Sequence, residues 1–535
     1  MRDKILNAIG MALLGVCFAV SLVRIAARQF SRDEQGGDHV TIRFAHWQLE
    51  NGVRSTLDQI AAEYMKLHPG VKVVQLPIPE SIYTNWLVTQ LVGETAPDLI
   101  QIGIGMTDER IARFFLPLDD LASNPNPYNR GTSLEDLPLR ATLFDGMESG
   151  YVSTLLEYYG VPISGASVRM YYNLELLEQI TGAGTPPETY EELVSLAKET
   201  QAYAQRKGVP LVPIAGSRYN APMIMQRLFS SQTQKLVERL NPPGIFGEDL
   251  IRRADDYLDG RWSLDSEEVR SGFDLMHEVG QYMQPGFIQL QRDDATLSFV
   301  QGRALMISTG SWDATSIRQQ ASFRIGVSTI PFPSTESRVY GRYLLGELSE
   351  AGTNGGVVFG ITRGSPQADV AKDFLRFLAS QRMNQLWTDE SGWIPAVVGI
   401  KVTPDVAPFL PVTVGYLPGI YPSIAAGGTF PSLNRLVGIN LHRLVGATGD
   451  TGAFINAIKP GYRDALIHDL RRNHRTALDI SQRSDTQFGG LAWTALAQPN
   501  DVKAAARMNA FMQSASMNDR KLYRIRHSLE KAEVQ

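Results

Sequence analysis

Residues 41–99, TIRFAHWQLENGVRSTLDQIAAEYMKLHPGVKVVQLPIPESIYTNWLVTQLVGETAPDL, decide the fold, because strand and helix patterns alternate along them. Short alternating or apolar runs predict strands, and apolar residues at i, i+3, i+4 and i+7 predict helices. The strand patterns are residues 41–47, 71–76 and 95–101, and the helix patterns are residues 55–68 and 82–92. In an open α/β sheet, ligands bind beyond the carboxyl ends of the strands. The loops that follow these strands are therefore the first place to expect a small-molecule site.

The same alternation continues far along the chain. Thr189 and Glu192 have the spacing of a capping box and predict the start of a helix. Residues 304–308 and 355–361 are apolar strand patterns, and residues 368–380 form a strongly amphipathic helix pattern. Alternating strands and helices favour an α/β fold built on mostly parallel sheets.

Length and charge bound the class of protein. The chain has 535 residues, enough for two or more domain cores, and a formal net charge of -5. A nucleic-acid-binding protein would favour a basic face, so we expect no nucleic-acid partner. The one cysteine, Cys17, lies in the first apolar segment, which leaves the body of the chain without disulfides or cysteine-ligated zinc.

Residues 1–30 predict an export segment. Arg2 and Lys4 precede an uncharged run over residues 5–23, and Arg24 follows it directly. Three interpretations stay open: a cleaved signal peptide, a lipoprotein signal ending at Cys17, and an uncleaved membrane anchor. All three place the body of the protein in the periplasm or at the cell surface.

Several short motifs, read in order, resemble one known family. The chain resembles the extracellular (family 1) solute-binding proteins of ABC sugar importers, of the maltose-binding-protein-like branch. The matching segments are residues 68–74 (HPGVKVV), 93–99 (GETAPDL), 159–162 (YGVP), 171–173 (YYN), 302–312 (GRALMISTGSW) and 392–395 (GWIP). Their order and spacing carry the resemblance, because each of them alone would recur by chance.

The resemblance implies a two-lobed periplasmic-binding-protein type II fold. Each lobe would be a mostly parallel sheet flanked by helices, followed by a helical C-terminal extension. The implied division is residues 39–160 and 331–390 for lobe one, 161–330 and 391–500 for lobe two, and 501–535 for a helical tail. A monomer that delivers a carbohydrate to the transmembrane subunits of an ABC permease is the implied function. A membrane-anchored sensory or accessory glycan-binding protein with the same body is the alternative.

Aromatic residues after predicted strands are candidates for sugar stacking. A sugar presents apolar C–H faces and hydroxyl groups, so its site needs flat rings and planar polar side chains, and such ring contacts are worth about 1 kcal/mol. Trp47 and Trp312 follow strand patterns, and Tyr219 and Asn220 follow the pattern of residues 209–215. The resemblance adds Trp393. For each ring, packing inside a lobe is the competing interpretation.

The other tryptophans are expected to be structural. Trp86 and Trp387 lie in amphipathic helix patterns and are expected in a core. Trp262 is flanked by Asp259, Gly260 and Ser263, a composition that favours a surface turn.

Four polar residues near the first strands could accept sugar hydroxyls: Glu50, Asp98, Gln101 and Asp108. Solvent exposure is the competing interpretation for three of them, and for Asp98 it is a turn cap after Pro97.

Catalytic and metal motifs are missing from the sequence. Acidic pairs are sequence neighbours, whereas a glycosidase needs two carboxylates that face each other across the substrate. The eight histidines show no metal-ligand spacing, and neither a Gly-x-Ser-x-Gly motif nor a P-loop occurs. We therefore expect a binding protein without catalytic residues, metal or cofactor.

Overall fold

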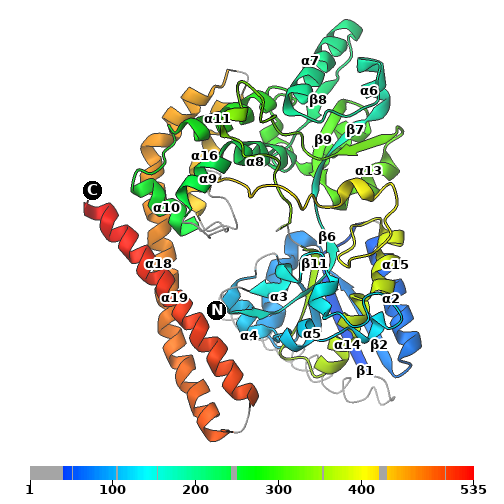
Figure 1. Ribbon diagram of the computed structural model, residues 1–535, viewed down its shortest axis with the longest axis vertical. Helices are drawn as coiled ribbons and strands as arrows, with labels where there is room; N and C mark the ends of the chain where they lie inside the picture. Colours follow the sequence, from blue (N-terminus) through cyan, green and yellow to red (C-terminus); the bar gives the residue numbers. More distant parts are fainter. Residues whose placement is uncertain are drawn as a thin grey trace, which may run out of the picture.

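The computed structural model describes residues 40–50, 52–103, 106–152, 155–241, 250–351, 355–420, 430–446, 448–499 and 502–534. The export segment expected at residues 1–30 lies outside them. Two α/β lobes, each built on one sheet, and a helical C-terminal region make up the fold (Figure 1). Among the described residues, no helix combines the length and apolar character needed to cross a membrane.

The first lobe contains a five-stranded sheet in the order β2-β1-β3-β11-β6. The strands are β1 (Val40–His46), β2 (Val71–Pro77), β3 (Leu99–Ile102), β6 (Val161–Gly165) and β11 (Gly355–Ile361). Neighbouring residues point to opposite faces of a strand. Leu99 and Phe359 accordingly join the core on one face, and Ile100 and Val358 join the core on the other.

Helices cover both faces of this sheet (Figure 1). One face packs against α2 (Val53–Leu67), α14 (Ala368–Leu378) and α15 (Gln381–Ser391), and the other packs against α3 (Glu80–Val92) and α4 (Asp108–Phe114). The short helix α5 (Asp119–Ser123) follows α4. The helices and strands expected over residues 41–99 are all present.

The second lobe contains a four-stranded sheet in the order β10-β7-β9-β8. Its strands are β7 (Val168–Asn173), β8 (Val212–Ala215), β9 (Ala304–Gly310) and β10 (Ile325–Ser328). Its helices are α6 (Leu174–Thr181), α7 (Tyr190–Lys207), α8 (Asn220–Gln232), α9 (Gln234–Leu240), α10 (Leu250–Leu258), α11 (Glu267–Gly280), α12 (Arg292–Val300) and α13 (Ala314–Gln320). The capping box expected at Thr189 and Glu192 opens α7.

The α/β class is confirmed, but the sheets are mixed and not mostly parallel. β1 pairs in parallel with β2 and β3, whereas β11 runs antiparallel to both of its neighbours. In the second sheet only β8 and β9 are parallel. Antiparallel neighbours need no helical crossover, and β7 enters the second sheet only two residues after β6 of the first.

The C-terminal region packs on the second lobe. It consists of α16 (Pro431–Asn440), α17 (His442–Val445), α18 (Thr451–Ala497) and α19 (Val502–Val534). Buried residues of all four helices, among them Leu433, Leu444, Tyr462 and Ile525, belong to the core of the second lobe. The helical extension is therefore confirmed, and its base is part of a lobe. The residue boundaries implied for the two lobes stay a prediction.

The chain passes between the lobes through three neighbouring segments. Residues 166 and 167 join β6 to β7, and the segment around Glu350 leads towards β11. A third segment runs from Val397, in the core of the first lobe, to Phe409, in the core of the second. We call these three segments the hinge.

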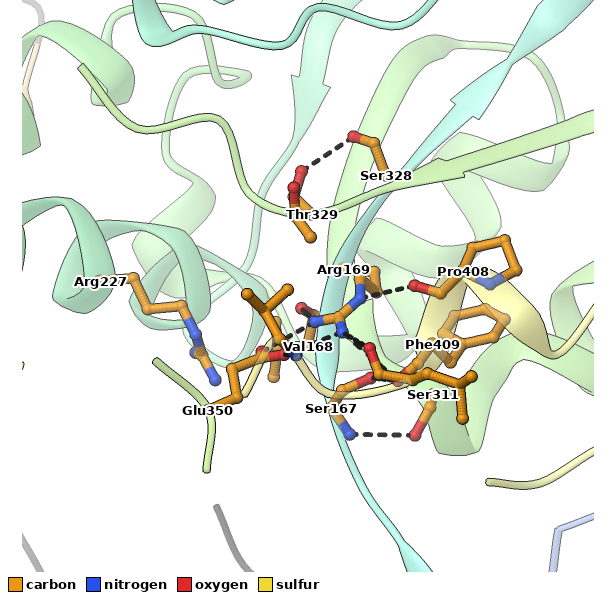
Figure 2. A network of polar contacts seen from close by, with 12 residues as sticks. Ser167, Val168, Arg169, Arg227, Ser311, Ser328, Thr329, Glu350, Pro408 and Phe409 are labelled. Carbon is orange, nitrogen blue, oxygen red and sulfur yellow. Dashed lines mark hydrogen bonds and ion pairs between the residues drawn. The ribbon is translucent and has the colours of Figure 1, made fainter. Parts of the chain in front are cut away.

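A buried guanidinium ties the hinge together (Figure 2). Arg169 is 1% exposed and makes paired bonds of 2.8 and 2.9 Å with the carboxylate of Glu350. It also donates to the carbonyl groups of Pro408, Phe409 and Leu410. One side chain of the first segment thus binds both of the others. Paired charge-assisted hydrogen bonds of this kind are among the strongest in proteins.

Removing Glu350 should destabilise the fold, because Arg169 would stay buried without a counter-charge. Breaking a buried ion pair in this way costs about 3 kcal/mol or more. We predict a loss of that size in the free energy of unfolding of Glu350→Ala, measured by urea denaturation. Glu347→Ala, at an exposed position nearby, is the control. Equal stability of the two variants would contradict the role given to the pair.

Candidate functional site

The candidate site begins at the carboxyl ends of β1 and β3. After His46, the last residue of β1, the chain continues through Trp47 and Gln48 to Glu50. Gln101 lies on β3 and accepts a hydrogen bond from the backbone nitrogen of Trp47 at 3.3 Å. Trp47 is half-buried and packs edge-on against Tyr83 of α3, with ring centroids 4.9 Å apart. The ring is therefore supported by α3 and stays partly accessible.

Gln48 links these residues into one polar group. In the amide orientation that satisfies its neighbours, its oxygen accepts from Gln101 Nε2 at 2.7 Å and from Trp47 Nε1 at 3.1 Å. Its nitrogen then donates to Glu50 at 3.2 Å. The network holds the Trp47 indole and the Glu50 carboxylate in a fixed arrangement.

The second lobe contributes aromatic residues from the ends of β8 and β9. These two strands are parallel, so the residues after them emerge at the same edge of the sheet. Tyr219 precedes α8, and Trp312 lies in the turn after β9. Gly310 makes room for the indole, because a Cβ atom there would lie 2.2 Å from the Trp312 ring.

Charged residues surround this aromatic pair. The Arg292 guanidinium lies over the Tyr219 ring, 4.8 Å from its centroid, and also bonds the Asp313 carboxylate. Asp313 further accepts a hydrogen bond from the Thr309 hydroxyl. Burial raises the pKa of Tyr219, whereas the Arg292 charge and a hydrogen bond to Trp312 lower it.

The two halves of the site meet. Burial raises the pKa of Glu50, in the first lobe, and the charges of Arg292 and Asp313, in the second lobe, also act on it. Trp312 is half-buried and packs against hydrophobic residues of both cores. The group Trp47, Gln48, Glu50, Gln101, Tyr219, Arg292, Trp312 and Asp313, which we call the interlobe site, therefore draws on both sheets.

Two expected ligand residues have internal partners. Asp98 lies at the amino end of β3, and its carboxylate accepts from the Arg43 backbone at 2.8 Å and from Ser365 at 2.7 Å. Asn220 is 1% exposed and donates to the carbonyl of Ser308 at 3.0 Å, which fixes α8 to β9. Both side chains are used inside their own lobe, so we leave them out of the interlobe site.

Two further expected residues also lie elsewhere. Trp393 is 4% exposed and packs edge-on against Trp387 in the core of the first lobe. The competing core interpretation describes it better. Asp108 is exposed in the first turn of α4, and we leave it out of the interlobe site. Trp262, expected at the surface, is also buried, and its indole donates to the carbonyl of Arg253 at 2.9 Å.

Gln48, Arg292 and Asp313 were missed by the sequence reasoning. Asp313 directly follows Trp312, and Gln48 directly follows Trp47, so proximity to a candidate ring was the available signal. Arg292 begins α12 and carries no such signal, because only the fold brings α12 to the end of β9.

The site is suited to binding a polar, ring-shaped molecule. It offers indole and phenol rings, amide groups, carboxylates and one guanidinium, the combination of flat apolar faces and hydrogen-bonding groups typical of small-molecule sites. Within the described part of the chain, no cluster of three or more His, Cys, Asp or Glu side chains could hold a metal ion.

Comparison with known proteins identifies the family. The sequence profile of the family described as bacterial extracellular solute-binding protein matches residues 59–408. A multiple sugar-binding protein of Streptococcus mutans serotype c is 21% identical over 422 residues, covering 75% of this chain and 86% of the relative. An sn-glycerol-3-phosphate-binding periplasmic protein of Yersinia pestis is 20% identical over 368 residues, covering 66% and 73%.

Solved structures share the fold. RafE from Streptococcus pneumoniae, in its apo form, covers 80% of this chain and 99% of its own at 18% identity, with a TM-score of 0.54. A chitin oligosaccharide binding protein covers 80% and 100% at 16% identity, with a TM-score of 0.55. At such identities the likeness establishes the two-lobed fold and nothing finer.

One titratable residue next to the site is kept neutral. His46 is fully buried, with Nε2 3.1 Å from the Gln75 side-chain oxygen. Burial lowers its pKa from 6.5 to about 4. The unfolded chain binds a proton at this histidine below about pH 6.5, whereas the folded chain does so only near pH 4. Protonation therefore does not reduce the free energy of unfolding above pH 6.5. As the pH falls from 6.5 towards 4, proton binding to the unfolded chain lowers the free energy of unfolding.

We predict that the free energy of unfolding falls between pH 6.5 and pH 4 by up to about 1.4 kcal/mol per pH unit from this histidine. In His46→Gln this part of the slope should be absent. His442→Gln, at an exposed position, should keep the parent slope. Urea denaturation at several pH values measures it, and an unchanged slope in His46→Gln would contradict the assignment.

Proposed function

Because this chain belongs to the family of bacterial extracellular solute-binding proteins, we propose that it captures a mono- or oligosaccharide between its two lobes and delivers it to an ABC permease. The observation that carries the proposal is the interlobe site, where Trp47 and Trp312 come from different lobes. One relative is a multiple sugar-binding protein and another is an sn-glycerol-3-phosphate-binding protein, and both support a small polyol ligand.

In this proposal the rings stack on the apolar faces of the sugar. Trp312 and Tyr219 would approach from the second lobe and Trp47 from the first, while Glu50 and Asp313 accept hydroxyl protons. Gln101 is 0% exposed and would support the site through its bonds to Trp47 and Gln48. A ligand that contacts both lobes favours the closed arrangement, because only that arrangement makes all of the contacts. The permease would then recognise the closed form.

The charges of the site support a neutral ligand. Arg292 bonds the Asp313 carboxylate, and its charge also acts on Glu50, so one guanidinium faces two carboxyl groups. An anionic ligand would add a further negative charge to a half-buried place, which raises its electrostatic cost. We propose a neutral sugar and no catalysis, since Arg292 and Thr309 already engage the Asp313 carboxylate.

The proposal also concerns location and attachment. Members of an extracellular family act in the periplasm or at the cell surface, and we propose the same location here. Attachment to the membrane through residues 5–23 is part of the alternative function, a sensory or accessory glycan-binding protein. Mass spectrometry of the mature amino terminus separates a cleaved from a retained segment.

Replacing Trp312 by Ala should weaken sugar binding about fivefold or more, because one stacked ring contributes about 1 kcal/mol or more. A thermal-shift panel of neutral sugars, with glycerol 3-phosphate as the anionic comparison, first selects the ligand, since a ligand of the folded state raises Tm. Calorimetry with that sugar then measures Kd for the parent chain and for the variant.

Two further variants make the test specific. Gly310→Ala keeps the indole but pushes it aside, so it should also weaken binding. Tyr203→Ala, on α7 at the far side of the second lobe, should bind as the parent does (Figure 1). A Trp312→Ala variant that folds and binds every sugar of the panel with the parent Kd would remove this ring from the site.

A further inference from the structure

The C-terminal helices form a hairpin whose far end differs from its base. Arg463 of α18 bonds the carbonyl of Ala532, and further along Asn518 of α19 bonds the carbonyl of Ala477, so the helices run antiparallel. The base is buried against the second lobe, with Ile525 fully buried. Figure 1 shows the other end, where α18 ends and α19 begins, standing clear of both sheets.

Large apolar side chains are exposed at this far end. Trp493 and Leu496 are each 75% exposed. They lie three residues apart and therefore on the same side of α18. Phe488 of α18 and Met512 of α19 line one groove between the helices and are 39% and 47% exposed. We call Phe488, Trp493, Leu496 and Met512 the apolar end.

The sequence of this region is depleted of charge. Residues 486–518 contain three charged side chains, Asp501, Lys503 and Arg507, whereas 20% of the whole chain is charged. A solvated helical hairpin would carry charges along its outer faces. Exposed apolar residues that gather in one place mark an interaction surface.

A basic band lies behind the apolar end. Residues 471–485 and 519–531 contain nine Lys or Arg residues against four Asp or Glu, in a chain whose net charge is -5. Exposed members on both helices are Arg471, Arg472, Arg475, Arg520, Lys521 and Arg526. Three acidic residues partly offset the band, since Asp479 pairs with Arg483, Glu530 with Arg526, and Asp259 with Lys531.

We propose that the far end of the hairpin docks on a bilayer that contains anionic lipids. Trp and Leu side chains enter the boundary between headgroups and acyl chains, where indole rings are favoured. Arg520 and Lys521, the members of the basic band nearest to Met512 along α19, contact lipid phosphates, and the rest of the band adds attraction at longer range. The basic band favours a membrane over a second copy of the chain as the partner. Two copies of the hairpin would bring like charges together, whereas anionic headgroups complement them. The attachment is independent of what the interlobe site binds.

The experiment places an environment-sensitive fluorophore at the apolar end of the full chain. Cys17→Ser removes the native thiol, and Leu496→Cys is labelled with nitrobenzoxadiazole. Val339→Cys, 68% exposed on the second lobe, carries the same label as the control. Both chains keep residues 1–30, so membrane binding by that segment is common to both. The probe is a vesicle of phosphatidylcholine and phosphatidylglycerol.

We expect the fluorescence at position 496 to shift to shorter wavelength and to rise about twofold or more with these vesicles, because the label leaves water. The label at position 339 should not respond. The response should weaken in 1 M salt, where the Debye length falls to about 3 Å. Adding Phe488→Ser and Trp493→Ser to the labelled chain should reduce it.

Three results would overturn the proposal. The first is a label at position 496 that does not respond to the vesicles. The second is an equal response with vesicles of pure phosphatidylcholine, which would show that anionic headgroups do not contribute to the binding. The third is a response without lipid that grows with protein concentration, which would identify a second copy of the chain as the occupant.

Discussion

The fold depends on how a buried positive charge is satisfied at the point where the chain changes lobes. Arg169 lies on the first residues of β7, just after the passage from β6, and solvent does not reach it. A buried guanidinium must be paired and hydrogen-bonded to be tolerated. Glu350 and the carbonyls of residues 408–410 meet that need, and they belong to the other two hinge segments. Burial lowers the pKa of the neighbouring Arg227, and Glu350 counteracts this shift (Figure 2).

The constraint at the hinge positions the interlobe site. Because the three hinge segments are held together at one place, the lobes can move relative to each other mainly by rotation about the hinge. Hinge closure of this kind is common around ligands. The carboxyl ends of β1 and β3 then face those of β8 and β9. Trp312 packs against both cores. Its ring can adopt that position because Gly310 has no side chain. The placement of this ring between the lobes therefore depends on the residue type at position 310.

The sequence allowed local structure to be predicted better than burial. Alternating and helical patterns located the elements of residues 41–99, and the spacing of Thr189 and Glu192 located the start of α7. These features depend on neighbours in the chain. The positions of Trp47, Trp312 and Tyr219 after strands followed from the same patterns, because the strands were recognisable.

Burial by distant segments could not be predicted in this way. Trp262 is flanked by turn-forming residues but packs edge-on against Tyr462 of α18, two hundred residues later. Trp393 follows the left-handed Gly392, and the chain then places its ring against Trp387. Asp98 bonds Ser365 from another part of the first lobe. Arg292 joins the site only because α12 packs beside β9. Each of these outcomes depends on a tertiary contact that no local pattern contains.

In the proposed function, both lobes contact one ligand and close on it about the hinge. Small-angle X-ray scattering of the full chain, titrated with the sugar that calorimetry shows to bind, tests this most directly. We expect the radius of gyration to decrease in proportion to occupancy and to reach a plateau at saturation. A sugar that saturates the protein and leaves the radius of gyration unchanged would contradict it.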